Sequence, residues 1–328
     1  AIADANVSST FAGWLENRHT AAAAQAEDRP AILFVILNKQ DDRAAVDITV
    51  NALRAQLPQL PGSRMLIVQD GEERDDYNEA IQIIDFHHYQ HHFIRLLQSA
   101  SVEWVQTVPA GTTFAPHSLV ALSAALQNQH GIHALYTDEA VSHAGTLTHF
   151  FKPPFNRDLF LGAPSLYLKR LFVRASSWLA SGVAESGEPE LELILKLIQQ
   201  HGFSCVGHYP DIVTVVEQHS LTAVSTDEEG ALIGHFAAQR QLPVEYVERY
   251  NGSAWRVRYA LDDRARVTII LTHNRDANLM TRCIASLMDH TASPDIEILI
   301  PVISDTETMV LQTAREVEKL LPGKVRVL

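Results

Sequence analysis

Short apolar runs rich in β-branched residues alternate along this chain with longer segments of helical period, and this alternation limits the possible folds more than any other feature. The candidate strands are the runs at 31–37, 64–69, 102–108 and 133–137. Strands that alternate with helices build βαβ units around a mostly parallel sheet. We therefore expect an α/β protein with a sheet flanked by helices.

The segments between these runs have the pattern of crossover helices. Apolar residues between 46 and 57 recur on one helix face, and the following LPQLPG ends the pattern. The segment 116–129 begins with a proline in its first turn and ends before a glycine. The clearest helix is PELELILKLIQQHG at 189–202, with glutamates near its positive end and a terminal glycine.

The end of the chain repeats its beginning. FVILNKQDD at 34–42 and IILTHNRDA at 269–277 both run from a strand through an asparagine and a polar loop into a helix. Only the start of a second copy is present, so we expect the chain to end inside a second domain. The expected parts are a helical arm at 1–27, a main domain at 28–225, a helical connector at 226–262 and an incomplete second domain at 263–328.

Composition excludes several classes of protein. With 26 Lys+Arg against 39 Asp+Glu, the net charge of −13 leaves no basic footprint for nucleic acid. No apolar run approaches the roughly 20 residues of a membrane-spanning helix. Cys205 and Cys283 form no metal-binding or disulfide pattern, and the N-terminus lacks the pattern of a secretory signal. We expect a cytoplasmic protein, with the inner face of the cell membrane as a second location.

Three segments resemble one enzyme family. VTIILTHNRDANLMTRCIASLMDHTASPDIEILI, from 267, resembles the opening of family 2 glycosyltransferases of the GT-A fold. ALYTDEAVSHAGTLTHFFKPPFNRDLF at 134–160 and GEPELELILKLIQQHGFSCVGHYPDIV at 187–213 resemble segments of the tandem enzymes that build O-antigen and related surface polysaccharides, many of them rhamnosyltransferases. The resemblance implies a GT-A domain over 28–225 and the start of another from 263. It also implies a UDP- or dTDP-sugar donor, such as a rhamnose donor, and a glycan acceptor.

An inverting transferase removes a proton from the acceptor hydroxyl with a carboxylate and stabilises the departing diphosphate with a divalent cation or cationic side chains. The resemblance places the catalytic base at Glu190. It places Asn38 and Asp70 at strand ends, as candidate nucleotide-sugar contacts. Two structural interpretations stay open. Glu190 is also suited to stabilising a helix dipole, and the Asp70-Gly71 pair is also suited to a turn.

The family's metal-binding DxD falls on PAGTTFAPHSL at 109–119, which contains no carboxylate. Mg²⁺ and Mn²⁺, the cofactors that the resemblance implies, prefer carboxylate ligands, so the sequence assigns no metal ligand at 109–113. Asp138 and Glu139 are the nearest acidic pair and lie on the acceptor side in the family. We take Asp138 as a second candidate catalytic residue, and Glu139 and Lys152 as candidate nucleotide-sugar contacts. A structural or solvated role for Lys152 is the alternative.

Two motifs lie outside this scheme. The histidines of DFHHYQHHF form two i, i+4 pairs if the segment is helical, which suits two-point metal binding, but no third ligand is evident and a polar helix face is the simpler interpretation. They are His87, His88, His91 and His92. In the N-terminal arm, Phe11, Trp14 and Leu15 form an apolar stripe that must be buried against this domain or another chain.

Two functional hypotheses follow. The first is an active glycosyltransferase of surface-polysaccharide assembly, favoured by the retained Asn38, Asp70, Asp138 and Glu190. The second is a catalytically degenerate GT-A module that binds glycan or scaffolds a partner transferase domain. It is favoured by the missing DxD and by Pro301, which stands where the second copy should carry its nucleotide-contacting aspartate. No G-x-G-x-x-G follows a candidate strand and no P-loop motif is present, which argues against a dehydrogenase and a P-loop NTPase.

Overall fold

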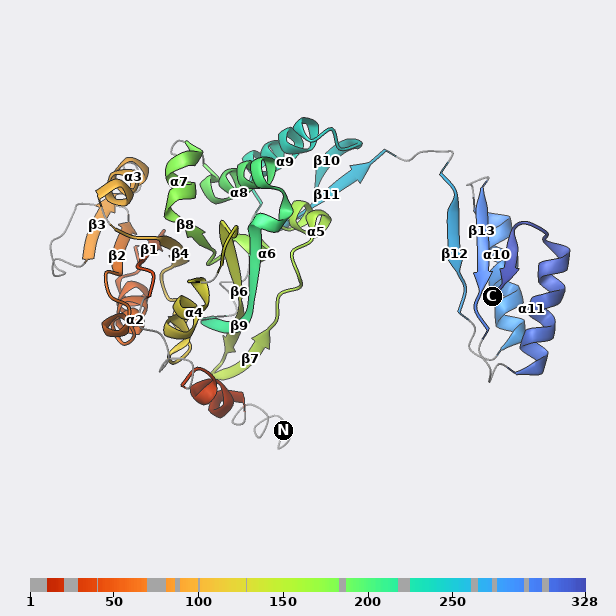
Figure 1. The fold of residues 1–328 in the computed structure, drawn as a ribbon, viewed down its shortest axis with the longest axis horizontal. Helices are drawn as coiled ribbons and strands as arrows, with labels where there is room; N and C mark the ends of the chain where they lie inside the picture. Colours follow the sequence, from red (N-terminus) through yellow and green to blue (C-terminus); the bar gives the residue numbers. More distant parts are fainter. Residues whose placement is uncertain are drawn as a thin grey trace. The chain divides into compact units, whose positions relative to one another are not determined.

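A computed structural model describes most of the chain. The described residues are 11–20, 29–39, 41–69, 81–85, 89–99, 101–127, 129–182, 187–217, 225–260, 265–272, 276–291, 295–302 and 307–328, with no side chains described for 81–92. The chain divides into two compact units, Ala1–Tyr259 and Ala260–Leu328 (Figure 1). Each unit is described by itself.

Unit 1 is built on a mixed sheet in the order β3-β2-β1-β4-β8-β6-β9-β5, with β7 paired to β6. Its strands are β1 (Ile32–Asn38), β2 (Arg64–Gln69), β3 (Ile81–Asp85), β4 (Trp104–Pro109), β5 (Thr113–Phe114), β6 (Ala134–His143), β7 (Thr146–Phe150), β8 (Phe172–Arg174) and β9 (Val206–Glu217). The four strands β3, β2, β1 and β4 are parallel throughout, and β6 is parallel to β9. The expected α/β class is confirmed.

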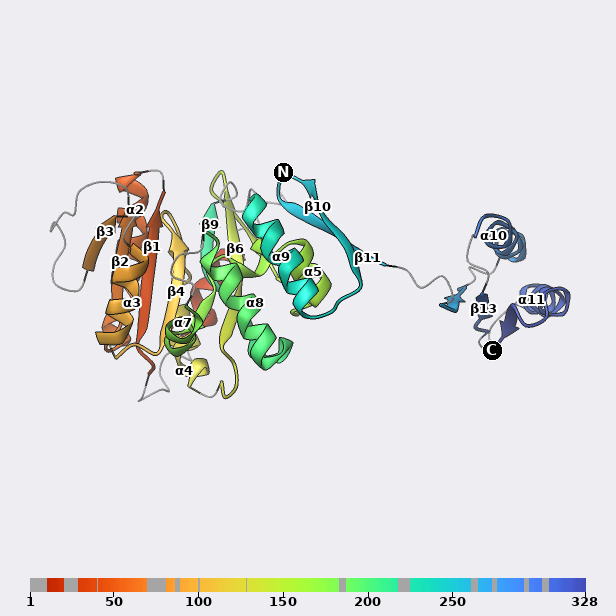
Figure 2. The same ribbon diagram turned by 90° about the horizontal axis from the view of Figure 1, so that it is seen from above.

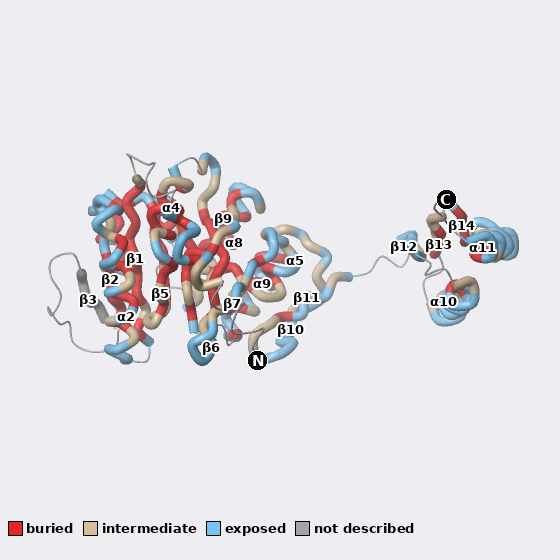
Figure 3. Tube along the Cα trace, turned by 90° about the horizontal axis from the view of Figure 1, so that it is seen from below, coloured by how far each residue is buried: buried red, intermediate tan, exposed pale blue. Residues whose placement is uncertain are grey.

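Helices cover both faces of this sheet (Figures 1 and 2). One face carries α2 (Arg43–Arg54) and α4 (Ser118–Leu126), and the other carries α3 (Tyr89–Ser99), α7 (Ala175–Ser181) and α8 (Pro189–His201). Alternate residues of β1 therefore enter different cores: Phe34 packs on the α2 side, and Val35 packs on the α8 side. Because both faces are covered, β1 and β2 are apolar almost without interruption, and Figure 3 shows them largely buried.

The sheet has a gap that positions the candidate site. β8 is short and antiparallel, and it pairs with β4 only at 104–106 and with β6 only at 134–135. Beyond these residues, no described strand lies between the carboxyl-terminal halves of β4 and β6. The segment just before β8 lies there instead. Gln106 Nε2 of β4 donates a hydrogen bond to the Arg170 carbonyl of this segment at 3.1 Å. Ligands of open α/β sheets bind in crevices at the carboxyl ends of strands.

Two small helices precede β8. They are α5 (Arg157–Gly162) and α6 (Ser165–Leu168). Asn156 caps α5 by accepting a hydrogen bond from the Leu159 amide at 3.0 Å. Tyr167 of α6 is buried against Tyr136 of β6, and this contact fixes the start of the segment that leads into the gap.

The 226–262 segment differs from its prediction. It is helical in α9 (Asp227–Gln239) but then forms a hairpin of β10 (Val244–Asn251) and β11 (Ala254–Tyr259), so the expectation of a helical connector is wrong beyond Gln239. Asn251-Gly252 is a strong hairpin signal, and the flanking residues are rich in Val, Tyr and Trp. Trp255 of β11 is buried against α9 and joins the core on the α8 side of the sheet.

The N-terminal arm contains a helix over 11–18 that packs against the rest of unit 1. Leu15 is only 3% exposed and contacts the end of the sheet at Ala140 and Ile212. His19 Nε2 lies 3.0 Å from the Ile212 carbonyl oxygen. The apolar stripe is therefore buried within the same chain, and only Trp14 of its three members stays substantially exposed.

Unit 2 repeats the order that opens unit 1. Its elements are β12 (Val267–Ile270), α10 (Ala277–His290), β13 (Ile296–Ile300), α11 (Thr308–Leu320) and β14 (Val325–Val327), with the strands parallel in the order β12-β13-β14. The repeat includes the helix cap: Asp42 accepts from the Ala45 amide, and Asp276 accepts from the Leu279 amide, both at 3.0 Å.

The two cysteines differ in their surroundings. Cys205 is buried in unit 1, whereas Cys283 is exposed on α10 of unit 2. Among the described helices of either unit, none is long and apolar enough to cross a bilayer.

Candidate functional site

Asn38 ends β1 at the carboxyl edge of the sheet, and its side chain is engaged within the protein. Its Oδ1 accepts a hydrogen bond from the Asp42 amide at 2.9 Å, and its Nδ2 lies 3.5 Å from Gln69 Oε1. Asn38 is almost fully buried. It therefore fixes the loop between β1 and α2 against the end of β2. Asp70, the next predicted contact, lies outside the described residues.

Glu190 lies in the first turn of α8 beside the end of β4. Its carboxylate takes a side-chain hydrogen bond from Thr107, and the Lys39 ammonium is close enough to interact electrostatically with it. Burial raises the pKa of Glu190 above its ordinary value, and this effect exceeds the opposing effects of the hydrogen bonds and of Lys39. A half-buried carboxyl with a raised pKa is suited to removing a proton near neutral pH.

Asp138 is buried in β6 and connects neighbouring segments. Its Oδ1 accepts a hydrogen bond from the Lys152 amide at 2.9 Å and lies 2.9 Å from His208 Nε2. The His208 ring stacks on Tyr136, with 4.4 Å between ring centroids. These contacts fit a positioning role for Asp138, because they hold the segment after β7 and the start of β9 against β6.

Glu139 and Lys152, predicted as ligand contacts, are brought together as a buried ion pair. Lys152 Nζ lies 2.7 Å from Glu139 Oε1, and Arg170 donates to both oxygens of Glu139 at 2.9 and 2.6 Å. All three side chains are 1–2% exposed. Burial raises the pKa of Glu139, but Lys152 and Arg170 outweigh it, so the net pKa lies below its ordinary value.

Two residues of this region were missed by the sequence reasoning. Arg170 fills the gap between β4 and β6, and Lys169 precedes it and is half-buried. Burial, and then the charge of Arg170, lower the pKa of Lys169 to about 8. No local pattern marks either residue, because the gap is defined by pairing between strands that are distant in sequence.

The stretch at 109–113, which the structure describes completely, does not fit a divalent metal ion. Its hydroxyls already donate to backbone carbonyls: Thr112 Oγ1 to Pro109 at 2.7 Å, and Thr113 Oγ1 to Val215 at 3.1 Å. These neutral groups lack the carboxylate oxygens that Mg²⁺ and Mn²⁺ prefer. The metal that the family resemblance implies therefore has no ligands here.

Asp138 and Glu139 do not supply the missing ligands, since Glu139 is saturated by two cations. Throughout the part of the chain that the structure describes, no group of three His, Cys, Asp or Glu residues is placed to hold a metal ion. The paired histidines of 87–92 are outside the residues with described side chains. The described side chains thus do not fit the metal that the resemblance implies.

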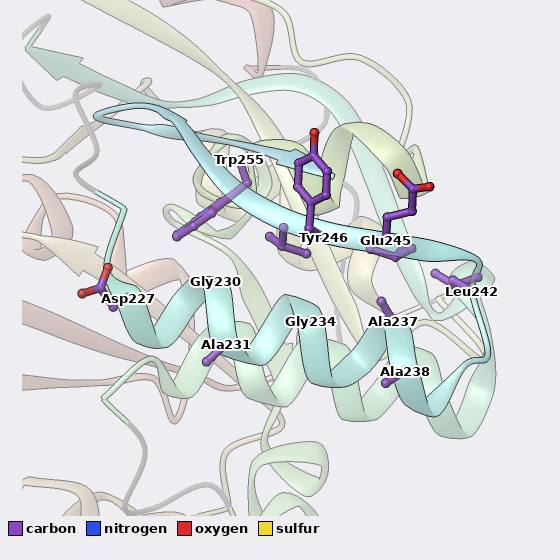
Figure 4. A pocket seen from close by; sticks show the side chains of 12 residues that line it. Asp227, Gly230, Ala231, Gly234, Ala237, Ala238, Leu242, Glu245, Tyr246 and Trp255 are labelled. Carbon is purple, nitrogen blue, oxygen red and sulfur yellow. The ribbon is translucent and has the colours of Figure 1, made fainter. Parts of the chain in front are cut away.

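A separate cavity of about 460 Å³ lies between α9 and the β10–β11 hairpin (Figure 4). Small residues of α9 line one side, and side chains of the hairpin line the other. Those labelled in Figure 4 are Asp227, Gly230, Ala231, Gly234, Ala237, Ala238, Leu242, Glu245, Tyr246 and Trp255. None of the predicted site residues lines this cavity.

No known protein-family profile matches this chain, and no curated protein matches its sequence. Solved structures with a partly similar fold include S. aureus TarS 1-349 in complex with UDP, at 13% identity and a TM-score of 0.43, covering 62% of this chain and 64% of that one. The chain thus matches less than two thirds of the TarS chain.

Another is glucosyl-3-phosphoglycerate synthase from Mycobacterium tuberculosis in complex with Mn2+, UDP and glucosyl-3-phosphoglycerate, at 12% identity and a TM-score of 0.41, covering 76% of this chain and 91% of that one. At these values the likeness has no bearing on the activity or the ligands of this chain.

Proposed function

We propose that the chain is a family 2 glycosyltransferase, acting at or near the inner face of the cell membrane. It moves a sugar from a UDP- or dTDP-sugar to a growing surface polysaccharide, with inversion at C1. The observation that carries this proposal is the position of Glu190, a half-buried carboxyl with a raised pKa at the carboxyl edge of β4. The family resemblance of 134–160, 187–213 and the segment from 267 supports the same reaction.

Each side chain has its own part in this chemistry. Glu190 takes the proton of the acceptor hydroxyl while the hydroxyl oxygen attacks C1 of the donor sugar. The bond from C1 to the diphosphate breaks, and its electron pair leaves with the diphosphate. Thr107 orients the Glu190 carboxylate through their hydrogen bond. Asp70 contacts the nucleotide, Asn38 fixes the neighbouring loop, and Asp138 positions the acceptor side.

A catalytically degenerate module that binds glycan or scaffolds a partner domain is the second candidate. The observation that favours it is the carboxylate-free stretch at 109–113 with its internally bonded hydroxyls. The two candidates differ in one measurable property, since a degenerate module need not bind a donor nucleotide.

A thermal-shift screen tests the choice. The protein is heated with UDP, dTDP, GDP and their common sugars, each in EDTA and with added Mn²⁺. A ligand at 100 times its Kd stabilises the folded state by about 2.7 kcal/mol. The expected result is a shift with one nucleotide, together with transfer of its sugar that E190Q lowers about 10²- to 10⁴-fold. Absence of any shift in a folded sample would favour the degenerate module.

A further inference from the structure

Among the described residues, the gap between β4 and β6 gathers more positive than negative charge. Two carboxylates meet three cations there, and the electrostatic environment of Lys169 contains Arg170, Glu139 and Lys152. The groups are the cations Lys152, Lys169 and Arg170, and the carboxylates Asp138 and Glu139, with His208 beside Asp138. The surplus positive charge lies where ligands of open α/β sheets bind.

The three cations are not equivalent. Lys152 and Arg170 are buried and bound to Glu139, whereas Lys169 is half-buried, so part of it is exposed to solutes. Arg170 also has spare donor capacity: among the described atoms, its buried Nη1 has no hydrogen-bond partner. A buried donor without an acceptor is costly, so the cluster is suited to an added anion.

The backbone at this point is held in an uncommon conformation. Arg170 has φ = 62°, in the left-handed region that residues other than glycine seldom adopt. The bidentate pair with Glu139 and the hydrogen bond from Gln106 Nε2 to the Arg170 carbonyl hold it there. Strain of this kind persists where the surroundings over-determine the geometry, which is common at ligand sites.

We propose that Lys169, backed by Arg170, binds the diphosphate of the nucleotide sugar and supplies the positive charge for which 109–113 has no metal ligands. This inference rests on the proposed function and names how that site holds its leaving group. An ammonium and a guanidinium are both suited to phosphate oxygens, and a cation beside the diphosphate stabilises the charge that develops as the bond to C1 breaks.

The proposal has a consequence for pH. Burial lowers the pKa of Lys169 most, Arg170 lowers it further, Glu139 raises it and Lys152 lowers it, which leaves the pKa at about 8. A bound diphosphate favours the ammonium form and raises this pKa, so binding takes up a proton above about pH 8. Affinity for a diphosphate must therefore weaken as pH rises from 7 to 9, by up to about tenfold per pH unit above the free pKa.

Calorimetric titration of the whole chain with UDP and with inorganic pyrophosphate, in EDTA, tests this at pH 7 and pH 9. We expect wild type to bind both ligands in EDTA, and K169M to bind both at least about tenfold more weakly at pH 7, the change expected from 1.4 kcal/mol. K169R should keep binding but lose the pH dependence. K196M is the control, since it removes the same charge from a 41% exposed lysine on α8. Circular dichroism confirms folding of each variant.

The outcomes separate the two proposals. UDP binding that disappears in EDTA, or that K169M leaves unchanged, overturns the role of Lys169 while the proposed function stands. Binding of pyrophosphate that depends on Lys169, without binding of any nucleotide, leaves the anion site standing and overturns the proposed function. If wild type binds neither pyrophosphate nor any nucleotide, both in EDTA and with added Mn²⁺, both proposals fail. Should K169M not fold, K169R decides: unchanged pH dependence in that variant overturns the inference.

Discussion

The Glu190 carboxyl has opposite effects on stability and on the proposed catalysis. Its pKa is raised in the folded state, so the folded protein favours the neutral form. Neutral Glu190 contributes fully to the free energy of unfolding below the ordinary pKa of about 4.5. This contribution is lost as pH rises through the raised pKa of the folded protein. We therefore expect E190Q to unfold at higher urea concentration at pH 7 than wild type, while sugar transfer falls about 10²- to 10⁴-fold.

The control for E190Q is E192Q, which changes a partly exposed acid of the same helix turn that pairs with Lys196. It should keep transfer activity within about twofold, since exposed pairs are worth less than about 1 kcal/mol. Transfer by wild type should fall as the pH drops through the raised pKa of Glu190. An E190Q protein with wild-type activity would remove Glu190 from the mechanism.

The buried ion cluster gives a second prediction at this scale. E139Q leaves Lys152 and Arg170 buried without their carboxylate, so we expect a loss of about 3–5 kcal/mol in the free energy of unfolding, measured in urea at pH 7. The exposed pair of Glu248 with Arg256 is the control, and E248Q should change that free energy by less than about 1 kcal/mol. Equal losses in E139Q and E248Q would show that Glu139 does not stabilise a buried ion cluster.

Sequence reasoning recovered these residues unevenly, for physical reasons. The segment resemblance predicts Glu190 as the base, and the structure places its carboxylate beside Thr107 at a strand end. The same reasoning picked out Glu139 and Lys152 but as ligand contacts, because burial depends on the tertiary fold and not on local pattern. Arg170, which makes their cluster possible, follows no motif at all.

At the scale of elements, packing of the hairpin on α9 depends on one glycine. A Cβ at Gly230 would lie 2.4 Å from the buried Trp255 ring, whereas one at Gly234 meets nothing within 4 Å. G230A should lower the free energy of unfolding by about 1–3 kcal/mol through overpacking. G234A, in the same helix, should raise it by up to about 1 kcal/mol through helix propensity.

Thermal and urea unfolding of the two alanine variants checks this contrast, and equal effects at both positions would show that Trp255 does not pack against Gly230. The hairpin was one of the elements that sequence reasoning missed. The sequence analysis predicted a helical connector over 226–262, although Asn251-Gly252 marked a turn between strands. The parallel strands were easier to predict, because burial on both faces makes their apolar runs continuous.

At the scale of the whole molecule, each unit has its own core. The three clusters of unit 1 and the single cluster of unit 2 share no residue. We expect a fragment of residues 1–260 to fold alone and to melt within about 2–4 °C of the corresponding transition in the full chain, the shift that 1 kcal/mol causes at this size. Loss of cooperative melting in the fragment would contradict this independence.

The placement of the two cysteines allows the two units to be followed separately by thiol labelling. Cys205 is buried in unit 1, so a maleimide reaches it only when that unit opens. Burial also raises the pKa of its thiol to about 11, which keeps it in the less reactive thiol form. Cys283 is exposed on unit 2 and should be labelled at once. A fluorophore can thus be attached to one unit of the native chain without mutagenesis, and the slower second labelling then times the opening of the other.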